Sequence, residues 1–583
     1  MRRLTDSAGR IIERVESRCF GGDVLATLLG FVFFVFTVGF EKLNPRNVAW
    51  LTFNDQKTHL LGWYFFAADQ WRWPLGSNPM YGWEGKNSIV YTDSWPGMAL
   101  VFKTLNLEPV NQGQYFGFGF LVGALALFVG ARRLFWSLGL ALLPSLIASG
   151  LLGTTAVFWW MQRWYPALSA GLAVLVWALY FYVDDPRHPN RLRRRWSVLL
   201  VLAAATHAYL TIVVIAILGS LLWRRLLLDR RSLKQSLINL AIIGTVTTAS
   251  MYVFGYFTVP SKWAQTGGYG WYASNVLGLI DSNEASRFLP DVPSLSGQYE
   301  PTALGLGTLL LLFVIIVHRL RSHTPIGVAR IVREHAALAA VLLLLGLLAI
   351  SNTVSIADSS FTIPLPQRVE HGLSIFRSSA RFMWPTLIVV TVTIIVLTIR
   401  QLRHGVLIVA LALIIQIVDS TPQARTIALL EDGNSVTESY DESFWSRVPT
   451  TYTAITSLPA QSLGFNWESC AFAAAKTGRT GECGYFSRVQ GLEAVNRERS
   501  SQVLSGKLEN NVIYMVSRGW LESNRRDLDL VFDDPAVNVV AAVGVFGFGS
   551  DTVFLFPACA SQVSCSFLGS YSRPFDASIV VSG

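Results

Sequence analysis

The chain has 583 residues, of which 52% are hydrophobic and only 15% are charged. A soluble protein of this length carries about a quarter charged residues, so the composition excludes an ordinary soluble globular protein and predicts an integral membrane protein. The net charge of +9 is concentrated in short connectors between apolar segments. We therefore expect it to set the orientation in the membrane and not to bind nucleic acid.

The N-terminus is basic and precedes the first apolar segment. Residues 1–22 include five arginines, and the apolar segment runs over 24–40. A signal peptide would have a shorter apolar region followed by a small-residue cleavage site, which is not found here. We therefore predict that residues 1–22 are cytoplasmic and that the first membrane helix is not cleaved.

Further apolar segments approach the roughly 20 residues that a helix needs to cross the hydrocarbon layer. With the first one, the candidate membrane helices are 24–40, 115–130, 138–158, 167–183, 237–256, 304–317, 336–350, 384–399 and 406–418. Basic runs lie in the connectors and predict a cytoplasmic location for Arg132–Arg133, 187–195, 224–234, 318–333 and 400–403.

One more apolar stretch, 197–223, has basic runs on both sides. If both sides are cytoplasmic, the stretch enters and leaves by the same face, and it is too short for two full crossings. We predict a short helical hairpin buried among the other helices, because bent backbone is tolerated at membrane depth only inside protein or against a wet cavity. His207 falls near its middle and is a candidate substrate-binding residue; a hydrogen-bonded structural histidine is the alternative.

These segments predict a mainly α fold, a transmembrane bundle of about eleven helices over 23–418. Three long connectors, 41–114, 257–303 and 351–383, are expected to face the periplasm. The region 419–583 is more polar and contains short β-prone runs such as 512–516 and 552–556. It predicts a small periplasmic α/β domain.

Cysteine usage agrees with that location of the C-terminal region. Four of the five cysteines lie in it, and Cys19 is expected on the cytoplasmic side. An even number of cysteines in an oxidising compartment predicts two disulfides, and proximity favours Cys470–Cys483 and Cys559–Cys565. A zinc site is the alternative.

The first long connector has an unusual composition for a loop. It sets four carboxylates among many aromatic rings: Asp55, Asp69, Glu84 and Asp93. Asp55 and His59 are four residues apart and would share one face of a helix. Asp55 is the candidate proton acceptor, with a helix cap or an ordinary Asp–His pair as the alternative. Asp93 is either a substrate-binding residue or a turn residue, and Asp69 is expected to cap a helix or pair with Arg72.

The other two long connectors supply further candidates. Arg377 and Arg381 are four residues apart just before an apolar segment. Two guanidinium groups on one helical face are suited to hold a phosphate or pyrophosphate, although snorkelling to lipid headgroups is the alternative. The second connector contains GGYGWY, with Tyr269, and QYE, with Glu300. Its glycines and aromatic rings suggest a mobile loop that covers a sugar.

Together these groups indicate sugar transfer from a lipid phosphate to a hydroxyl. Such a reaction needs a carboxylate to accept the proton of the attacking hydroxyl and cations to stabilise the leaving phosphate. Aromatic faces would contact the sugar rings. Nucleotide sugars are not expected outside the cytoplasm, so the donor would be anchored in the membrane.

The arrangement resembles the GT-C superfamily of polytopic membrane glycosyltransferases, and within it a bacterial group. The matching stretches are NDQKTH, GWYFF, WRWPLG, YTDSWP, HAYL, GGYG, QYE and FRSSARFMWP. The resemblance implies a catalytic carboxylate soon after the first helix, a position that Asp55 matches. It also implies a polyprenyl-phosphate sugar donor, inversion at the anomeric carbon and a location in the bacterial inner membrane. The paired acidic motif of metal-dependent oligosaccharyl transferases is missing, so no cofactor is expected, with a divalent metal left open.

Three other functions remain alternatives. A transporter or flippase of lipid-linked sugars would explain the membrane helices and His207, and a lipid-linked polysaccharide polymerase would use arginines without needing Asp55 as a base. A non-catalytic assembly protein would bind through the C-terminal domain. The sequence does not name the sugar or the acceptor; a cell-envelope glycan such as lipopolysaccharide is an expectation from the resemblance and the location.

Overall fold

The computed structural model describes residues 21–574, with gaps at 53–54, 106–112, 164, 228–232, 260–268, 296, 299, 301, 323–332, 430–439, 461–466, 485, 488–491, 525, 529–538, 544–551 and 558–571. The chain divides into two compact units. The first unit comprises Met1–Asn44, Tyr115–Met251 and Thr266–Leu430. The second comprises Pro45–Gln114, Tyr252–Gln265 and Glu431–Gly583, so most of the first long connector belongs with the C-terminal region.

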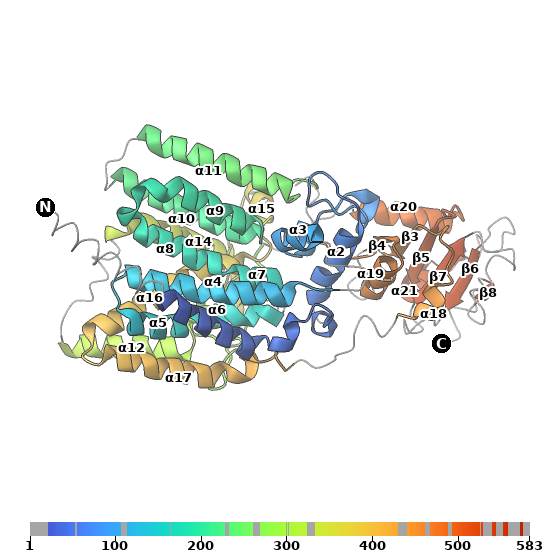
Figure 1. Cartoon of the computed structure of the whole chain (residues 1–583). Helices are drawn as coiled ribbons and strands as arrows, with labels where there is room; N and C mark the ends of the chain where they lie inside the picture. Colours follow the sequence, from blue (N-terminus) through green and yellow to red (C-terminus); the bar gives the residue numbers. More distant parts are fainter. Residues whose placement is uncertain are drawn as a thin grey trace. The chain divides into compact units, whose positions relative to one another are not determined.

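The first unit is built from apolar helices that run side by side (Figure 1). They are Gly21–Thr37, α4 (Phe116–Ser137), α5 (Leu142–Gly153), α6 (Ala156–Trp159), α7 (Pro166–Gly171), α8 (Ala173–Asp184), α9 (Leu192–Ala204), α10 (Ala208–Leu227), α11 (Leu233–Val253), α12 (Leu306–Ser322), α14 (Ala336–Ile350), α16 (Trp384–Gln401) and α17 (Gly405–Ala424). The apolar segments that the sequence singled out fall on these helices, although 138–158 is divided between α5 and α6 and 167–183 between α7 and α8. The predicted mainly helical fold is therefore confirmed.

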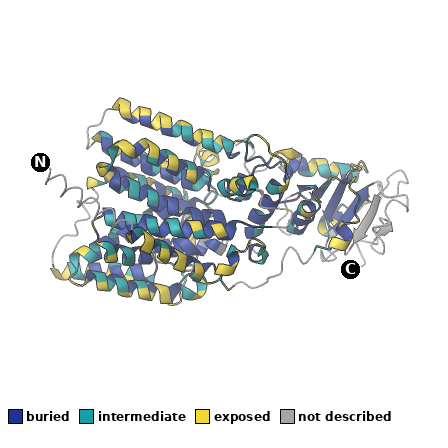
Figure 2. Cartoon of the chain, in the orientation of Figure 1, coloured by how far each residue is buried: buried dark blue, intermediate teal, exposed yellow. Residues whose placement is uncertain are grey.

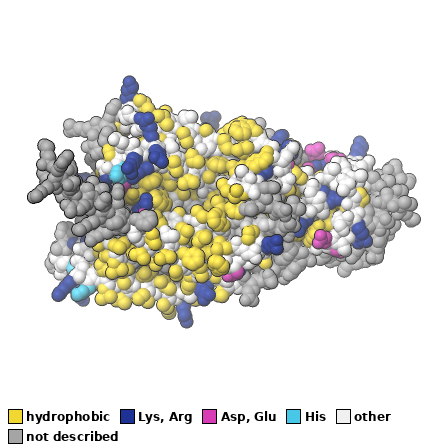
Figure 3. Space-filling view, viewed as in Figure 1, with side chains coloured by type: hydrophobic (Ala, Val, Ile, Leu, Met, Phe, Trp, Pro, Cys, Tyr) yellow, Lys and Arg dark blue, Asp and Glu magenta, His cyan; other side chains and the backbone are white. Residues whose placement is uncertain are grey.

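The helices differ in length and in burial. Among the described residues, six helices are long and apolar enough to cross a membrane, and three more are apolar but shorter. The span from α7 to α8 is 78% buried, whereas α11 is only 22% buried, so α8 lies inside the bundle and α11 at its edge (Figure 2). Hydrophobic side chains cover much of the visible face of these helices (Figure 3). A count of about eleven membrane helices stays a prediction.

The stretch 197–223 is divided as predicted, but not into a short hairpin. α9 ends at Ala204, α10 begins at Ala208, and the two helices pack against each other. α10 alone has 20 residues and is long enough to cross a membrane. α10 extends beyond the apolar stretch, because Arg224 and Arg225 belong to its last turn.

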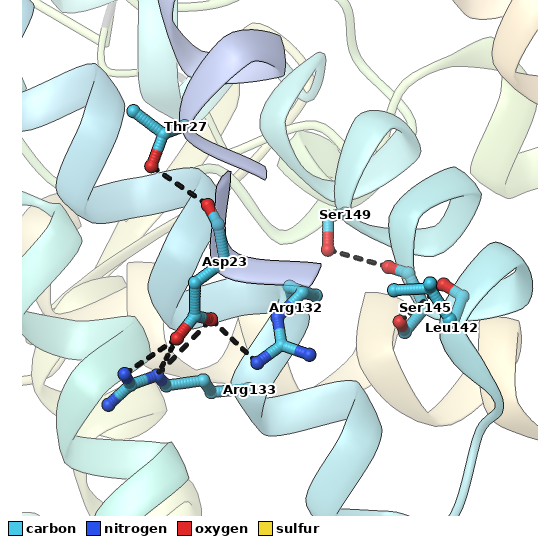
Figure 4. Close-up of polar contacts among 7 residues, drawn as sticks. All are labelled: Asp23, Thr27, Arg132, Arg133, Leu142, Ser145 and Ser149. Carbon is cyan, nitrogen blue, oxygen red and sulfur yellow. Dashed lines mark hydrogen bonds and ion pairs between the residues drawn. The ribbon is translucent and has the colours of Figure 1, made fainter. Parts of the chain in front are cut away.

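Arg132 and Arg133 lie inside α4, so the prediction that they form a connector is wrong. Both donate to the carboxylate of Asp23 on the first helix, with N–O distances of 2.6 Å for Arg132 and 2.7 Å for Arg133 (Figure 4). Arg132 is 1% exposed. A buried arginine requires a counter-ion, and Asp23 supplies it, so the first helix and α4 are joined by charge as well as by packing.

The last part of the first unit contains a small structural element that the sequence did not predict. Strands β1 (Thr353–Ile356) and β2 (Ser359–Thr362) form an antiparallel two-stranded sheet after α14. The short helix α15 (Gln367–Leu373) and the 3₁₀ helix η11 (Ser379–Met383) then lead into α16.

The C-terminal part of the second unit is an α/β domain, as predicted. Its six-stranded mixed sheet has the order β4 (Thr480–Glu482), β3 (Ala454–Leu458), β5 (Val512–Ser517), β7 (Thr552–Pro557), β6 (Val539–Val543) and β8 (Ser572–Pro574). β3 is parallel to β4 and β5, and the remaining pairs are antiparallel. The predicted β-prone runs are β5 and β7. The helices are α18 (Glu442–Trp445), α19 (Trp467–Lys476), α20 (Leu492–Leu504) and α21 (Arg518–Ser523).

One of the two predicted disulfides is present. Cys470 in α19 is bonded to Cys483, just after β4, and both residues are buried. The predicted bond between Cys559 and Cys565 lies outside the described residues, as does Cys19.

The first connector folds with this domain and uses its aromatic rings as core. It contains α2 (Gln56–Ala68), α3 (Pro96–Thr104) and the 3₁₀ helices η2 (Ala49–Leu51), η3 (Trp83–Gly85) and η4 (Ile89–Thr92). Nine of its rings are buried: Trp50, Trp63, Tyr64, Phe65, Phe66, Tyr81, Trp83, Tyr91 and Trp95. These nine rings pack inside the unit and are not available to contact a sugar, whereas for the exposed rings that role stays a prediction. Trp71 and Trp73 are exposed.

Candidate functional site

Asp55 occupies the N-cap position of α2, but its side chain makes no capping hydrogen bond. It is half-buried, and only its backbone carbonyl is engaged, by the N–H of Thr58 at 3.0 Å. Within the described residues, no hydrogen bond or ion pair involves its carboxylate. A carboxylate that is neither a cap nor part of an ion pair is free to accept a proton or to bind a substrate hydroxyl. The alternative that the Asp55 side chain caps α2 is therefore wrong.

His59 lies one turn further along α2 and is 1% exposed. Its ring Nδ1 is hydrogen-bonded to the backbone carbonyl of Asp93. The backbone carbonyl of His59 accepts a hydrogen bond from Ser94 Oγ at 2.7 Å. His59 thus joins α2 to the turn at residues 92–95, and its role in substrate binding stays a prediction.

Asp93 is the turn residue that one reading of the sequence predicted. It ends η4 with a left-handed backbone, φ 52°, and Trp95 repeats that conformation at φ 52°. Left-handed backbone is unfavourable for residues other than glycine and is often found near functional sites. Burial, and secondarily the Asp93 carboxylate, raises the pKa of Tyr256. The Asp93 side chain therefore lies near Tyr256, and its role in substrate binding stays a prediction.

In the first unit, Glu300 and Arg381 form a buried ion pair. Arg381 Nε donates to Glu300 Oε1 at 2.8 Å, and the side chains are 5% and 1% exposed respectively. The other carboxylate oxygen, Oε2, has no hydrogen-bond partner within the described residues. Burial raises the pKa of Glu300, and Arg381 and His207 oppose that shift.

Two tyrosine rings enclose the Arg381 guanidinium. Its central carbon lies 4.5 Å from the ring centroid of Tyr165 and 5.2 Å from that of Tyr209. A guanidinium between aromatic faces is held by cation–π attraction and keeps its N–H groups in the plane between the rings. Its terminal nitrogens make no hydrogen bond with a described residue. Arg381 therefore retains donors for an anionic or hydroxyl group.

The two arginines do not lie on one helical face, so that prediction is wrong. Arg377 is in a bend, and Arg381 is in the 3₁₀ helix η11. Arg377 Nη2 donates to the Tyr272 hydroxyl at 2.7 Å, and its guanidinium lies 4.8 Å from that ring. The segment leaves α-helical geometry because Arg381 is turned toward Glu300 and the Ala380 N–H is bonded to the Tyr272 carbonyl.

His207 and Tyr209 complete this cluster. His207 precedes α10, and its Nδ1 accepts the Tyr209 N–H at 3.2 Å, so the ring caps the start of the helix. The Tyr209 hydroxyl accepts the Ser378 N–H at 2.9 Å. The structural alternative for His207 is therefore satisfied in part. Tyr269 is related to this cluster only by its position in the sequence, three residues before Tyr272. Its hydroxyl donates to the Leu348 carbonyl at 3.5 Å.

The eight predicted site residues therefore form two groups, one in each unit. Asp55, His59 and Asp93 are in the second unit. The first unit brings together four of the other five: His207, Glu300, Arg377 and Arg381. Sequence reasoning missed the three tyrosines that hold the arginines in place: Tyr165, Tyr209 and Tyr272. The sequence gave a signal for two of them, since Tyr209 lies in the stretch HAYL and Tyr272 ends the stretch GGYGWY.

A metal site is not formed by the part of the chain that the structure describes. No group of three or more His, Cys, Asp or Glu side chains in those ranges is arranged to hold a metal ion.

Two models of known protein families match the chain. A family model described as a domain of unknown function (DUF6311) matches residues 27–421, more than half of the chain. The chain belongs to the DUF6311 family. A second model, the DUF6311 C-terminal domain, matches residues 444–533. The DUF6311 C-terminal match covers β3 to β5 and includes the disulfide. No curated protein matches the chain.

Proposed function

We propose that this member of the DUF6311 family is a membrane glycosyltransferase. It transfers a sugar from a polyprenyl-phosphate donor to a hydroxyl of a cell-envelope glycan or glycolipid, at the periplasmic face and with inversion. The composition, the apolar helices and the resemblance to GT-C enzymes support this class. A glycan of the lipopolysaccharide type is the acceptor that we favour.

In the proposed reaction, the acceptor oxygen forms a bond to the anomeric carbon while the bond from that carbon to the phosphate oxygen breaks. Asp55 accepts the proton of the attacking hydroxyl. Polyprenyl phosphate leaves with the electron pair, and attack from the opposite face inverts the anomeric carbon. The negative charge on the leaving phosphate requires a cation to stabilise it, and within the first unit we assign phosphate binding to Arg381 and Arg377.

The geometry of Arg381 suits that role. The residue is fixed by Glu300 through Nε and by two tyrosine rings, so its orientation needs no change when an anion arrives. Pre-oriented donors stabilise developing charge better than flexible ones. Glu300 is then a positioning residue for Arg381.

The observation that carries the proposal is the state of the Asp55 carboxylate. It stands soon after the first apolar helix, at the start of α2, half-buried and without a hydrogen bond or ion pair within the described residues. A purely structural aspartate at a helix N-terminus would normally cap the helix, and this one does not.

The test replaces Asp55 by Asn, which keeps the size and removes the basicity. Mass spectrometry compares envelope glycans from cells with the wild-type protein, without the protein, and with Asp55→Asn at matched protein levels. We expect the variant to lose the same glycan as the strain without the protein. Asp358→Asn, which removes an exposed carboxylate from the turn between β1 and β2, is the matched control and should keep the glycan. A glycan at wild-type abundance in the Asp55 variant would refute the proposal.

A further inference from the structure

The C-terminal domain holds the segment that carries Asp55. We propose that residues 467–487 act as a clamp on the first connector, and that Lys57, Glu468 and Ser487 are positioning residues for Asp55 and Asp93. The inference rests on the proposed function, because that function gives the two carboxylates their roles in the reaction. The contacts that carry it all lie within the second unit.

The first contact of the clamp is at the start of α2. Lys57, two residues after Asp55, forms an ion pair with Glu468 in the first turn of α19. The side chains are 26% and 20% exposed, so the pair is partly shielded from water. Lys57 Nζ also lies 5.8 Å from the Trp467 ring centroid. This contact fixes the turn of α2 that presents Asp55.

The second contact is a backbone pairing between β4 and the connector. Gly82 N–H donates to the Gly481 carbonyl and Gly481 N–H donates to the Met80 carbonyl, both at 2.9 Å. A Cβ atom at position 481 would lie 2.5 Å from the Phe65 ring, which is closer than real Cβ contacts. Glycine is therefore required for β4 to approach α2 this closely.

The third contact reaches the turn that bears Asp93. Both the N–H and the hydroxyl of Ser487 donate to the Tyr91 carbonyl, at 3.0 and 3.2 Å. Next to them, the Phe486 ring packs against Tyr81 at 4.7 Å and Trp83 at 5.3 Å between centroids. The backbone two residues before Asp93 is thus held by the C-terminal domain.

The disulfide joins these attachments. Cys470 is in α19, which contacts the start of α2, and Cys483 is between Gly481 and Ser487. The bond therefore links the element that holds Asp55 to the segment that holds the Asp93 turn. A linked pair of attachments fixes the spacing of the two carboxylates more tightly than two separate contacts would.

Exchanging the charges of the ion pair separates positioning from mere packing. Lys57→Glu and Glu468→Lys each place like charges together, and the double exchange restores an opposite pair. Glycan product is measured by mass spectrometry at matched protein levels, and the thermal unfolding midpoint of the full chain is measured in detergent. Lys507→Glu, which makes the same charge change at an exposed residue of the unit, is the control.

We expect each single exchange to lower the product about tenfold, because small displacements of a catalytic group are costly. The unfolding midpoint should change little, and the double exchange should restore the product. Single exchanges that keep wild-type product, or a double exchange that stays as low as the singles, would overturn the clamp.

A second readout does not depend on sugar transfer. Hydrogen exchange of the Thr58 amide, which donates to the Asp55 carbonyl, should become about fivefold faster in each single variant and return to the wild-type rate in the double. If no glycan depends on the protein but this exchange pattern holds, the proposed function fails and the clamp stands. If the exchange rates do not respond, the clamp fails whatever the glycans show.

Discussion

The two groups of candidate site residues, one in each unit, hold their carboxylates differently. In the first unit, the buried carboxylate of Glu300 is paired with Arg381. In the second unit, Asp55 is half-buried and unpaired within the described residues, while its surroundings are held by aromatic packing and by the disulfide. Glu300 orients a guanidinium within the first unit, whereas Asp55 in the second unit retains a carboxylate without a hydrogen bond to a described residue.

The largest effect should come from breaking the Glu300–Arg381 pair. Glu300→Ala leaves a buried guanidinium without its counter-ion, so we expect the free energy of unfolding to fall by about 3–5 kcal/mol. Glu300→Gln keeps the hydrogen-bond acceptor and should cost less. Thermal unfolding in detergent measures both, and Glu370→Ala, at an exposed position of α15, is the control. A Glu300→Ala protein as stable as this control would show that the first unit does not depend on the pair.

The aromatic core of the second unit is tested by two substitutions of Tyr81. Its ring stacks on Phe65 at 4.3 Å and meets Phe486 at 4.7 Å, and it is fully buried. Tyr81→Ala should lower the free energy of unfolding by about 3–5 kcal/mol. Its hydroxyl has no hydrogen-bond partner within the described residues, so Tyr81→Phe should be neutral or slightly stabilising. A large loss for Tyr81→Phe would mean that the hydroxyl is engaged.

A smaller effect is expected from Lys103, which lies in the last turn of α3 and reaches the end of α2 with its ammonium group. Its Nζ donates to the Phe66 carbonyl at 2.6 Å and lies 4.3 Å from the Phe66 ring. Burial lowers its pKa to about 8. Between about pH 8 and pH 10.5 the unfolded chain then binds more protons at this residue than the folded chain does, so its contribution to stability rises with pH.

Because Lys103 is only half-buried, solvent screening should keep this change below about 1 kcal/mol. Lys103→Met removes the titrating group. Unfolding midpoints between pH 7 and pH 9.5 should therefore increase more for the wild type than for the variant. Parallel pH profiles would contradict the lowered pKa.

The sequence predicted the parts of the fold that local properties decide. The apolar segments became helices because length and hydrophobicity act within each segment. The β-branched run at 512–516 became β5, and Cys470 found Cys483 only 13 residues away. The candidate site was predicted as a set of residue types, and His207, Glu300 and Arg381 did come together in the first unit.

The parts that the sequence did not predict depend on distant contacts. Arg377 and Arg381 left the expected helix because Glu300, about 80 positions earlier, binds one of them and Tyr272 binds the other. The aromatic rings of the first connector were expected to contact sugars, but Tyr81 and Trp83 pack against Phe486, some 400 residues later in the chain. Spacing in the sequence contains no information on such pairings.

The most direct test of the account measures donor and product in the same cells. Lipid-linked sugars and envelope glycans are quantified together for the wild type, for Asp55→Asn and for Asp55→Glu, at matched protein levels. We predict that Asp55→Asn abolishes the product glycan and causes a polyprenyl-phosphate sugar to accumulate, and that Asp55→Glu retains part of the transfer. Unchanged donor and product in Asp55→Asn would contradict the claim that this carboxylate accepts the proton.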